Sequence, residues 1–179
     1  MGRRLNLNAI QLQNFGGIAD LRRFLHAFVR MSDFSRVRTI GIVRDAERSE
    51  LGAFNSVRGA LEYASLPVPS ATGQLEGYRP AVSVMILPGG GRAGMLETLL
   101  WETIPDDVRC CIDSFFTCIE DLRGEALHRR HKARAMAYLS TKRKPQVSVG
   151  DAARRTYWDL DHEVLKPVRE FLQTIGTAV

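Results

Sequence analysis

A run of mostly β-branched residues, Thr39-Ile40-Gly41-Ile42-Val43, constrains the fold of this 179-residue chain more than any other segment. A short continuous apolar run of this kind is typical of a strand that is buried on both faces. The run ends in Arg44-Asp45-Ala46-Glu47, so two carboxylates follow directly on the predicted strand. In open α/β sheets, ligands bind at the carboxyl ends of the strands. Asp45 and Glu47 are therefore the first candidates for a functional site.

Strand and helix signals alternate along the chain. Apolar alternation or continuous apolar runs predict strands over residues 5–12, 39–43 and 81–87. Apolar residues at helical spacing predict helices over residues 18–29, 50–64, 94–104, 108–122, 124–139 and 164–175. Residues 70–79 and 145–150 are predicted loops, and Asp151 is expected to cap a short turn of helix. This order indicates a single α/β domain over residues 1–179, with a mostly parallel sheet flanked by helices and a helical C-terminal part.

Two helices have apolar faces that we expect to be buried. In the helix over residues 50–64 the inner residues are Leu51, Phe54, Val57 and Leu61. In the helix over residues 108–122 one face carries Cys111, Phe115, Cys118 and Leu122, which predicts buried thiols. A zinc site is not indicated, because no C-x-x-C pair occurs. His128 and His131 are one helical turn apart, but they lie among arginines, so we expect them to be exposed rather than metal-bound.

The cysteine count and the length of the apolar runs bear on the compartment. The chain has three cysteines, an odd number, and no secretory signal, which argues against a secreted disulfide scaffold. No apolar run approaches the ~20 residues that a membrane-spanning helix needs. We therefore expect a cytoplasmic protein without membrane contacts.

Basic residues are concentrated in two parts of the chain. The formal net charge is +5, a modest excess that permits contact with nucleic acid without requiring it. One cluster lies in the first forty residues, and a second runs from Arg129 to Lys144. These side chains form either solvated helix faces or contacts with phosphate groups, and both interpretations stay open.

The acidic pair has two interpretations. Asp45 and Glu47 are hard oxygen ligands, and Mg²⁺ binds through one or two carboxylates together with substrate phosphates. Alternatively, the pair is an ordinary acidic turn in which Asp45 caps the following helix. Glu97, early in the helix over residues 94–104, either interacts favourably with the helix dipole or points toward Asp45.

Three glycines follow the third predicted strand. Gly89, Gly91 and Gly94 match G-x-G-x-x-G between a strand and a helix, the context of a dinucleotide fingerprint. No further strand follows to complete a βαβ unit, and Met95 stands where a phosphate-binding P-loop has lysine. We therefore predict a flexible strand-to-helix turn, with a nucleotide-binding role as a distant third function.

Several short segments occur in an order that resembles a known family. They are Gly41–Glu47, Leu66–Pro69, Ile86–Pro88, Gly94–Glu97, Cys111–Asp113, His131–Arg134 and Tyr157–Asp161. Their joint order resembles the prokaryotic domain-of-unknown-function family 3226, whose fold is similar to the Toprim domain. The resemblance extends over nearly the whole chain from about residue 8.

The resemblance implies a Toprim-like sheet, a fold whose acidic residues hold Mg²⁺ for cutting or joining phosphodiesters. The Asp-x-Asp motif of Toprim domains would correspond to Asp45-Ala46-Glu47, and Gly16 or Gly17 to the glycine after the second strand. By analogy with the overcoming-lysogenization-defect nucleases, Glu97 would be a further metal ligand and Lys132 a transition-state cation. The implied function is Mg²⁺-dependent, nuclease-like phosphoryl transfer on nucleic acid, with contacts through the basic helices.

Two departures from the family pattern support a different function. Toprim domains begin with a strand that ends in a glutamate, followed by a helix, but no glutamate precedes Glu47. The first strand and helix are thus expected to be lost, or to be encoded upstream of Met1. After Pro88, related proteins have an Asp-Asn pair where this chain has Gly89-Gly90. The alternative is a non-catalytic module that binds nucleic acid or protein, including one in phage defence, as a homo-oligomer or with a protein partner.

Overall fold

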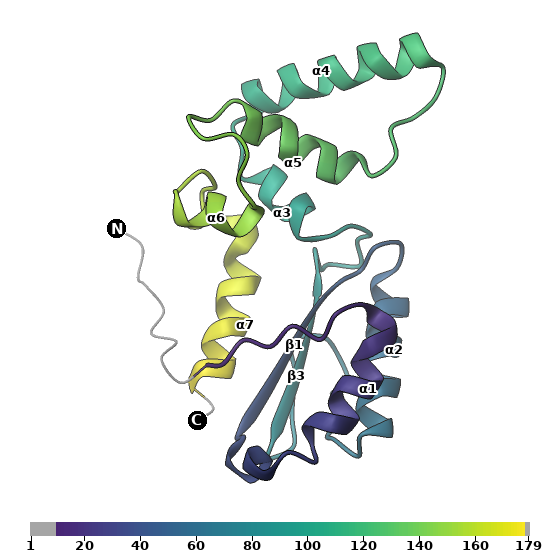
Figure 1. The fold of residues 1–179 in the computed structure, drawn as a ribbon, viewed down its shortest axis with the longest axis vertical. Coiled ribbons are helices and arrows are strands. Elements are labelled where there is room, and N and C mark those ends of the chain that lie inside the picture. The colour runs from purple at the N-terminus through teal and green to yellow at the C-terminus, as the bar shows by residue number, and fades with distance from the viewer. Residues whose placement is uncertain (1–9, 178–179) are drawn as a thin grey trace. The chain divides into compact units, whose positions relative to one another are not determined.

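A computed structural model describes residues 10–177, which form an α/β arrangement of seven α-helices and three strands (Figure 1). The chain divides into two compact units. The first unit combines Met1–Ala93 with Pro167–Val179, and the second comprises Gly94–Lys166. The single domain expected over residues 1–179 stays a prediction.

The sheet of the first unit is small and mixed. Its strands are β1 (Thr39–Asp45), β2 (Leu75–Glu76) and β3 (Ala81–Leu87), in the order β1-β3-β2. β1 and β3 are parallel, with Thr39 opposite Ala81 and Asp45 opposite Leu87, which confirms the predicted parallel pair. The prediction that β1 is buried on both faces was wrong: β1 is the edge strand of the sheet, only Ile42 in it is buried, and Val43 is 40% exposed. β2 pairs antiparallel with β3, so the prediction of a plain loop over residues 70–79 was wrong. Most of the predicted strand over residues 5–12 lies outside the described residues, and residues 10–12 have no regular secondary structure.

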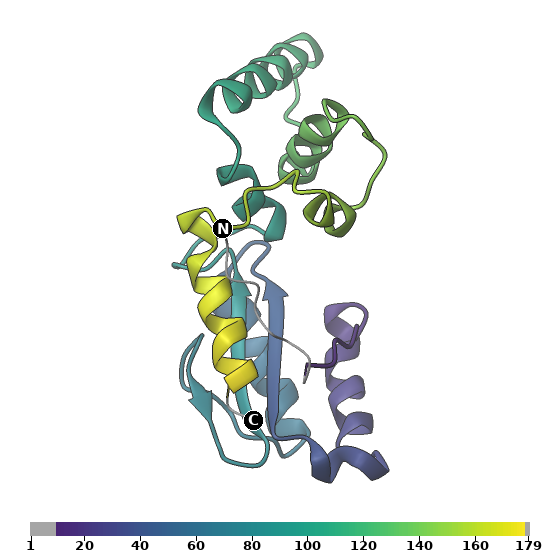
Figure 2. The ribbon, with the colours of Figure 1, turned by 90° about the vertical axis from the view of Figure 1, so that its left-hand side faces the viewer.

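Helices cover both faces of this sheet (Figures 1 and 2). α1 (Ile18–Phe28) and α2 (Glu50–Tyr63) lie on one face, and a short 3-10 helix, η1 (Ser32–Arg36), precedes β1. Their core includes Val57 and Leu61 of α2 against Val82 and Val84 of β3, all fully buried. α7 (Lys166–Thr177) lies on the other face, as both views show. Successive strand residues face opposite sides, so the alternate residues point to the face that α7 covers.

One face of α2 differs from the prediction. Leu51 was expected in the buried stripe but is 69% exposed. The buried stripe is centred on Ala53, Val57 and Ala60, and the small alanines allow α2 to lie close to the sheet. Leu51 falls outside this stripe because of its angular position on the helix.

The second unit is helical. It contains α3 (Leu96–Glu102), α4 (Asp106–Arg123), α5 (Arg130–Ser140), α6 (Val149–Arg154) and the 3-10 helix η2 (Glu163–Leu165). α5 starts later than predicted, because Gly124 ends α4 in the left-handed region at φ 68°. Asp151 is not the N-cap of α6; Ser148 is, since its Oγ accepts a hydrogen bond of 3.0 Å from the Asp151 backbone N–H.

The apolar face predicted for α4 is exposed. Cys111 and Cys118 are exposed, Phe115 is 58% exposed and Leu122 is 79% exposed, so the prediction of buried thiols was wrong. The helix instead buries Ile112 and Phe116, on a neighbouring stripe. No helix in residues 10–177 is long and apolar enough to span a membrane.

Candidate functional site at the end of strand β1

The acidic pair lies where β1 ends beside β3. Asp45 is the last residue of β1 and is paired with Leu87, the last residue of β3. The Ala46 backbone N–H donates a 2.7 Å hydrogen bond to the Leu87 carbonyl oxygen. The loop after β1 and the glycine loop after β3 therefore start side by side at the carboxyl edge of the sheet, as the parallel pairing predicted.

Asp45 is not the cap of the next helix. The N-cap of α2 is Ser49, whose Oγ accepts a 3.0 Å hydrogen bond from the Gly52 backbone N–H. The interpretation of Asp45 as a capping residue was thus wrong, because four residues separate it from the helix start. Asp45 is half-buried at the strand end and Glu47 is exposed.

Glu47 has an unusual backbone conformation for its position. Its φ is 52°, in the left-handed region that residues with side chains rarely adopt. Three other residues with side chains have positive φ, and all three flank helices. Ser65 and Thr156 follow the C-caps of α2 and α6, where a left-handed residue commonly ends a helix, and Arg129 is the N-cap of α5. Glu47 instead lies two residues after the end of β1, between this strand and the N-cap Ser49. Residues held in this region outside helix ends are concentrated at functional sites.

Arg44 places a permanent positive charge next to the two carboxylates. Its Nη1 donates a 2.8 Å hydrogen bond to the Ala53 carbonyl oxygen, which links the end of β1 to α2. Burial lowers the pKa of Arg44, while the nearby charges of Glu47 and Asp45 raise it. Arginine remains protonated under all ordinary conditions. The end of β1 therefore carries one fixed cation beside its acidic pair, a residue that the sequence interpretation had not singled out.

The glycine loop is attached to the first turn of α2. Gly89, Gly90 and Gly91 all have positive φ, between 69° and 83°, and a Cβ at Gly90 or Gly91 would meet nothing within 4 Å. Glycine is thus required by the backbone conformation and not by close packing. The Gly91 backbone N–H donates a hydrogen bond to the Glu50 carboxylate. Like Arg44, Glu50 was missed by the sequence reasoning, and its place in the first turn of α2 was the available signal.

The other two predicted site residues belong to the second unit. Glu97 is half-buried in the first turn of α3, where its charge interacts favourably with the helix dipole. Lys132 is exposed on α5. Their roles as a further metal ligand and a transition-state cation stay predictions. Within residues 10–177, no group of three or more His, Cys, Asp or Glu side chains is arranged to hold a metal ion.

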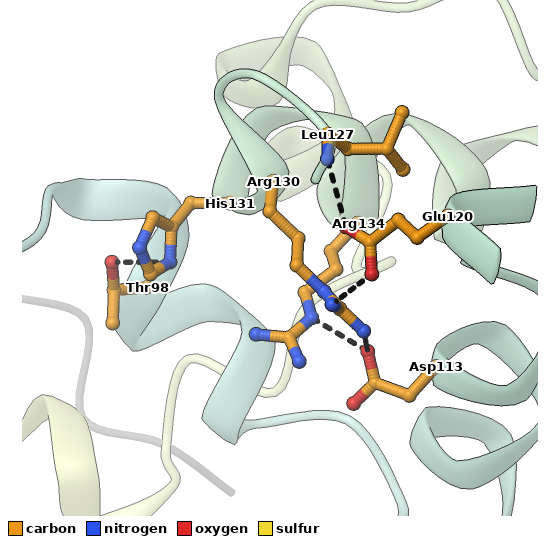
Figure 3. Close-up of polar contacts among 7 residues, drawn as sticks. All are labelled: Thr98, Asp113, Glu120, Leu127, Arg130, His131 and Arg134. Atoms are coloured by element: carbon orange, nitrogen blue, oxygen red, sulfur yellow. Dashed lines mark hydrogen bonds and ion pairs between the residues drawn. The ribbon is translucent and has the colours of Figure 1, made fainter. Parts of the chain in front are cut away.

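Part of the second basic cluster is occupied by ion pairs between α4 and α5 (Figure 3). Arg134 Nε donates a 2.7 Å hydrogen bond to Asp113, and Arg130 Nη1 donates one of 2.6 Å to Glu120. Arg129 and Lys132 are exposed. Only the exposed members of the cluster are therefore directly available to an external phosphate.

The two histidines differ from each other. His128 is exposed, as predicted. His131 is half-buried, and its Nδ1 lies 3.2 Å from the Thr98 hydroxyl oxygen. Figure 3 shows the two side chains in contact. The expectation of an exposed His131 was wrong, because α3 and α5 pack against each other in this unit.

These features define an α/β protein with a small mixed sheet and an acidic pair at its carboxyl edge. A family model described as "Protein of unknown function (DUF3226)" matches residues 3–177, and the chain belongs to this family. No curated protein and no solved structure matches the chain significantly. The resemblance to family 3226 is thus confirmed, whereas the similarity to the Toprim domain stays a prediction.

Proposed function

We propose that Asp45 and Glu47 bind Mg²⁺ and that the protein performs phosphoryl transfer on nucleic acid with a Toprim-like sheet. The supporting observation is the position of this pair at the carboxyl edge, with Glu47 held in a left-handed conformation two residues after the end of β1. Ligand sites of open α/β sheets lie at this edge.

The donor set fits a hard divalent cation. Asp45 and Glu47 offer carboxylate oxygens, and Mg²⁺ takes one or two such ligands while it keeps waters or substrate phosphates in its other positions. The bound ion would supply charge neutralisation at a phosphoryl oxygen. The hydrogen bond from Arg44 to the Ala53 carbonyl oxygen keeps the guanidinium group near the end of β1. The positive charge of Arg44 there limits the repulsion between the carboxylates of Asp45 and Glu47.

Exposed basic side chains would supply affinity for the nucleic-acid backbone. On and after α5 these are Arg129, Lys132, Arg143 and Lys144. Each phosphate that such a side chain neutralises releases condensed counterions, so binding would weaken steeply with added salt. The salt dependence of binding therefore reports the phosphate contacts, separately from the metal chemistry.

The direct test is cleavage of single-stranded and duplex DNA and RNA in Mg²⁺ or Mn²⁺. Asp45→Asn preserves the shape of the side chain but removes its charge, so cleavage should fall by roughly 10²-fold or more. Asp33→Asn, which changes an exposed aspartate of η1, is the matched control and should retain activity. Equal activity of Asp45→Asn and the wild type would refute the proposal.

A second candidate is a non-catalytic binding module, which the exposed apolar face of α4 favours. Phe115 and Leu122 are large apolar side chains at the protein surface, and such surfaces commonly mark contacts with other proteins. This candidate predicts binding without turnover. Calorimetry can test this candidate by measuring Mg²⁺ binding to the wild type and to two variants. Binding that is lost in Glu47→Gln but kept in Glu62→Gln, which changes an exposed glutamate of α2, would count against the non-catalytic module.

A further inference from the structure

The first unit carries the whole excess of positive charge in the chain. The second unit, Gly94–Lys166, has twelve Lys and Arg and twelve Asp and Glu, so it is neutral by formal charge. The first unit therefore holds the net charge of +5. Residues 18–38, which include α1 and η1, contribute five arginines and two aspartates. Within the first unit, this segment is a strong source of attraction for a polyanion.

Three side chains of this segment follow one another along one side of α1. Arg22, His26 and Arg30 are four positions apart, which is the spacing of neighbours on a helix surface. Arg22 and Arg30 are exposed, and His26 is half-buried. Arg30 lies two residues past the end of α1, and its Nη1 donates a 2.6 Å hydrogen bond to the His26 carbonyl oxygen. This bond holds the guanidinium group of Arg30 beside the last turn of α1.

α2 adds an aromatic ring to this row of side chains. α1 and α2 lie side by side (Figures 1 and 2), and Tyr63 is the last residue of α2. Arg22 Cζ lies 3.8 Å from the centre of the Tyr63 ring, and the centre of the His26 ring lies 5.2 Å from it. Tyr63 is nevertheless 48% exposed. We call Arg22, His26, Arg30 and Tyr63 the α1 platform, which combines cations with a partly exposed ring held by a cation–π contact.

The two arginines of the platform keep their charge for an external partner. Within the described residues, neither Arg22 nor Arg30 forms an ion pair, whereas Arg23 pairs with Asp20. Two further carboxylates lie close in sequence and are exposed: Asp33 and Glu62. The five arginines of residues 18–38 outnumber these three carboxylates. The charge around the platform is therefore complementary to a chain of phosphates.

We propose that the α1 platform binds single-stranded nucleic acid. Arg30 neutralises a backbone phosphate, and an unpaired base stacks on the surface that Arg22 and Tyr63 form. Proteins that bind single strands without sequence preference combine cations and aromatic rings in this way. Bases within a duplex are stacked on one another, so the platform favours single strands. The inference rests on the proposed function for nucleic acid as the substrate, but it needs neither the metal nor the acidic pair.

Fluorescence anisotropy in EDTA measures this binding without the metal chemistry. The probes are a labelled DNA strand of roughly 20 nucleotides, which is longer than one site of this kind, an RNA strand of the same sequence and the matching DNA duplex. At least one of the two single strands should bind more tightly than the duplex, and the tighter of the two identifies the class of nucleic acid. A duplex that binds as tightly as both single strands would overturn the proposal.

Substitutions separate stacking from charge. Tyr63→Leu removes the ring and should weaken single-strand binding by roughly fivefold or more, with an unchanged salt dependence. Tyr63→Phe keeps the ring and should retain the binding. Arg30→Gln should reduce the slope of log affinity against log salt concentration by about 0.7, the value for one phosphate of a single strand. Wild-type affinity in Tyr63→Leu, or the same loss in Tyr63→Phe, would overturn the stacking role.

Arg79→Gln is the matched control for Arg22→Gln. Arg79 is also an exposed arginine of the first unit over a tyrosine, and its Cζ lies 5.7 Å from the centre of the Tyr78 ring. Residues 70–79 contain no other basic residue, so no row of cations continues from it. Arg22→Gln should weaken single-strand binding severalfold, while Arg79→Gln keeps the wild-type affinity. Equal losses in the two variants would show a general effect of net charge and would overturn the proposal.

The platform and the phosphoryl-transfer proposal fail in different ways. Single-strand binding in EDTA without cleavage in Mg²⁺ or Mn²⁺ would refute phosphoryl transfer and support the platform. Cleavage by a Tyr63→Leu variant that keeps the wild-type affinity would refute the platform alone. Vesicles of phosphatidylserine and phosphatidylcholine test a lipid surface as the partner. Vesicle binding that Arg22→Gln abolishes, without binding of the nucleic-acid probes, would overturn the proposal.

Discussion

At the scale of single residues, Glu47 combines an unfavourable backbone conformation with an exposed carboxylate. A residue with a side chain at φ 52° costs roughly 1–2 kcal/mol relative to the right-handed region, and glycine avoids this cost. The chain nevertheless has glutamate there, at the edge of the sheet where ligands bind. Substitutions at Glu47 can therefore separate the effect of the backbone conformation on stability from the effect of the carboxylate on metal binding.

We expect Glu47→Gly to be more stable than Glu47→Ala by about 0.5–1 kcal/mol, because only glycine relieves the left-handed strain. Both changes remove the carboxylate, so both should weaken Mg²⁺ or Mn²⁺ binding in calorimetry. Urea unfolding measures the difference in stability. If Glu47→Gly were less stable than Glu47→Ala, the left-handed conformation would not hold in solution.

Gly41 is a second position where one atom has a large effect. A Cβ added there would lie 2.9 Å from Ile175 Cγ1 and 3.3 Å from Phe171 Cζ, both on α7. The glycine therefore allows α7 to lie directly on β1.

Gly41→Ala should lower the free energy of unfolding by about 1–3 kcal/mol, because the methyl group overpacks the contact with α7. Gly59→Ala is the control, since it lies on α2 where an added Cβ meets nothing within 4 Å, and it should stabilise the helix. In the double variant with Ile175→Ala, the cost of the added methyl should shrink, which thermal unfolding would show as non-additivity. Strict additivity would mean that the two side chains do not touch.

At the scale of the elements, the start of α2 supports the candidate site. Ser49 caps this helix, and the carboxylate of the next residue, Glu50, accepts a hydrogen bond from the Gly91 backbone N–H. Ser49→Ala should destabilise the protein by about 1 kcal/mol, because the Gly52 N–H loses its acceptor. Ser56→Ala, an exposed position within the same helix, should be neutral or slightly stabilising. Chemical denaturation of the pair measures the difference, and equal stabilities would contradict the cap.

The elements that the sequence predicted well are those with a strong local pattern. β1, β3, α1 and α2 have continuous or periodic apolar residues, and their observed bounds agree with the prediction within two residues. β2 was missed because two residues are too few to show a period and because its pairing partner, β3, is remote in sequence. The apolar face of α4 with Phe115 and Leu122 was predicted to be buried but is exposed, because periodicity locates an apolar face without showing which neighbour covers it.

The candidate site was predicted only in part for a similar reason. The place of Asp45 and Glu47 follows from local sequence, since Asp45 ends β1 and Glu47 lies two residues further along the chain. Arg44 and Glu50 depend on tertiary contacts, one with the Ala53 carbonyl oxygen and one with the Gly91 N–H. Contacts of this kind join positions 9 and 41 residues apart and leave no periodic signal.

At the scale of the whole molecule, the chain passes out of the first unit after Ala93 and returns to it at Pro167. The first unit is therefore completed by α7, whose Phe171 and Ile175 are buried. The second unit has a core of its own, which includes Leu99, Leu139 and Trp158. Because the cores are separate, we expect each unit to unfold locally with its own free energy of opening.

Hydrogen exchange tests whether the two cores open independently. Leu139→Ala removes a fully buried side chain of the second unit and should cost about 2–5 kcal/mol there. Amides of α3 to α6 should then exchange faster, while those of β1 and β3 keep their protection. Val57→Ala, which removes a fully buried side chain of the first unit, should produce the reciprocal pattern with a smaller effect. If the cores are independent, a substitution in one core should leave the protection of the other unchanged. Equal loss of protection throughout residues 10–177 in both variants would therefore show that the described residues unfold as one cooperative unit.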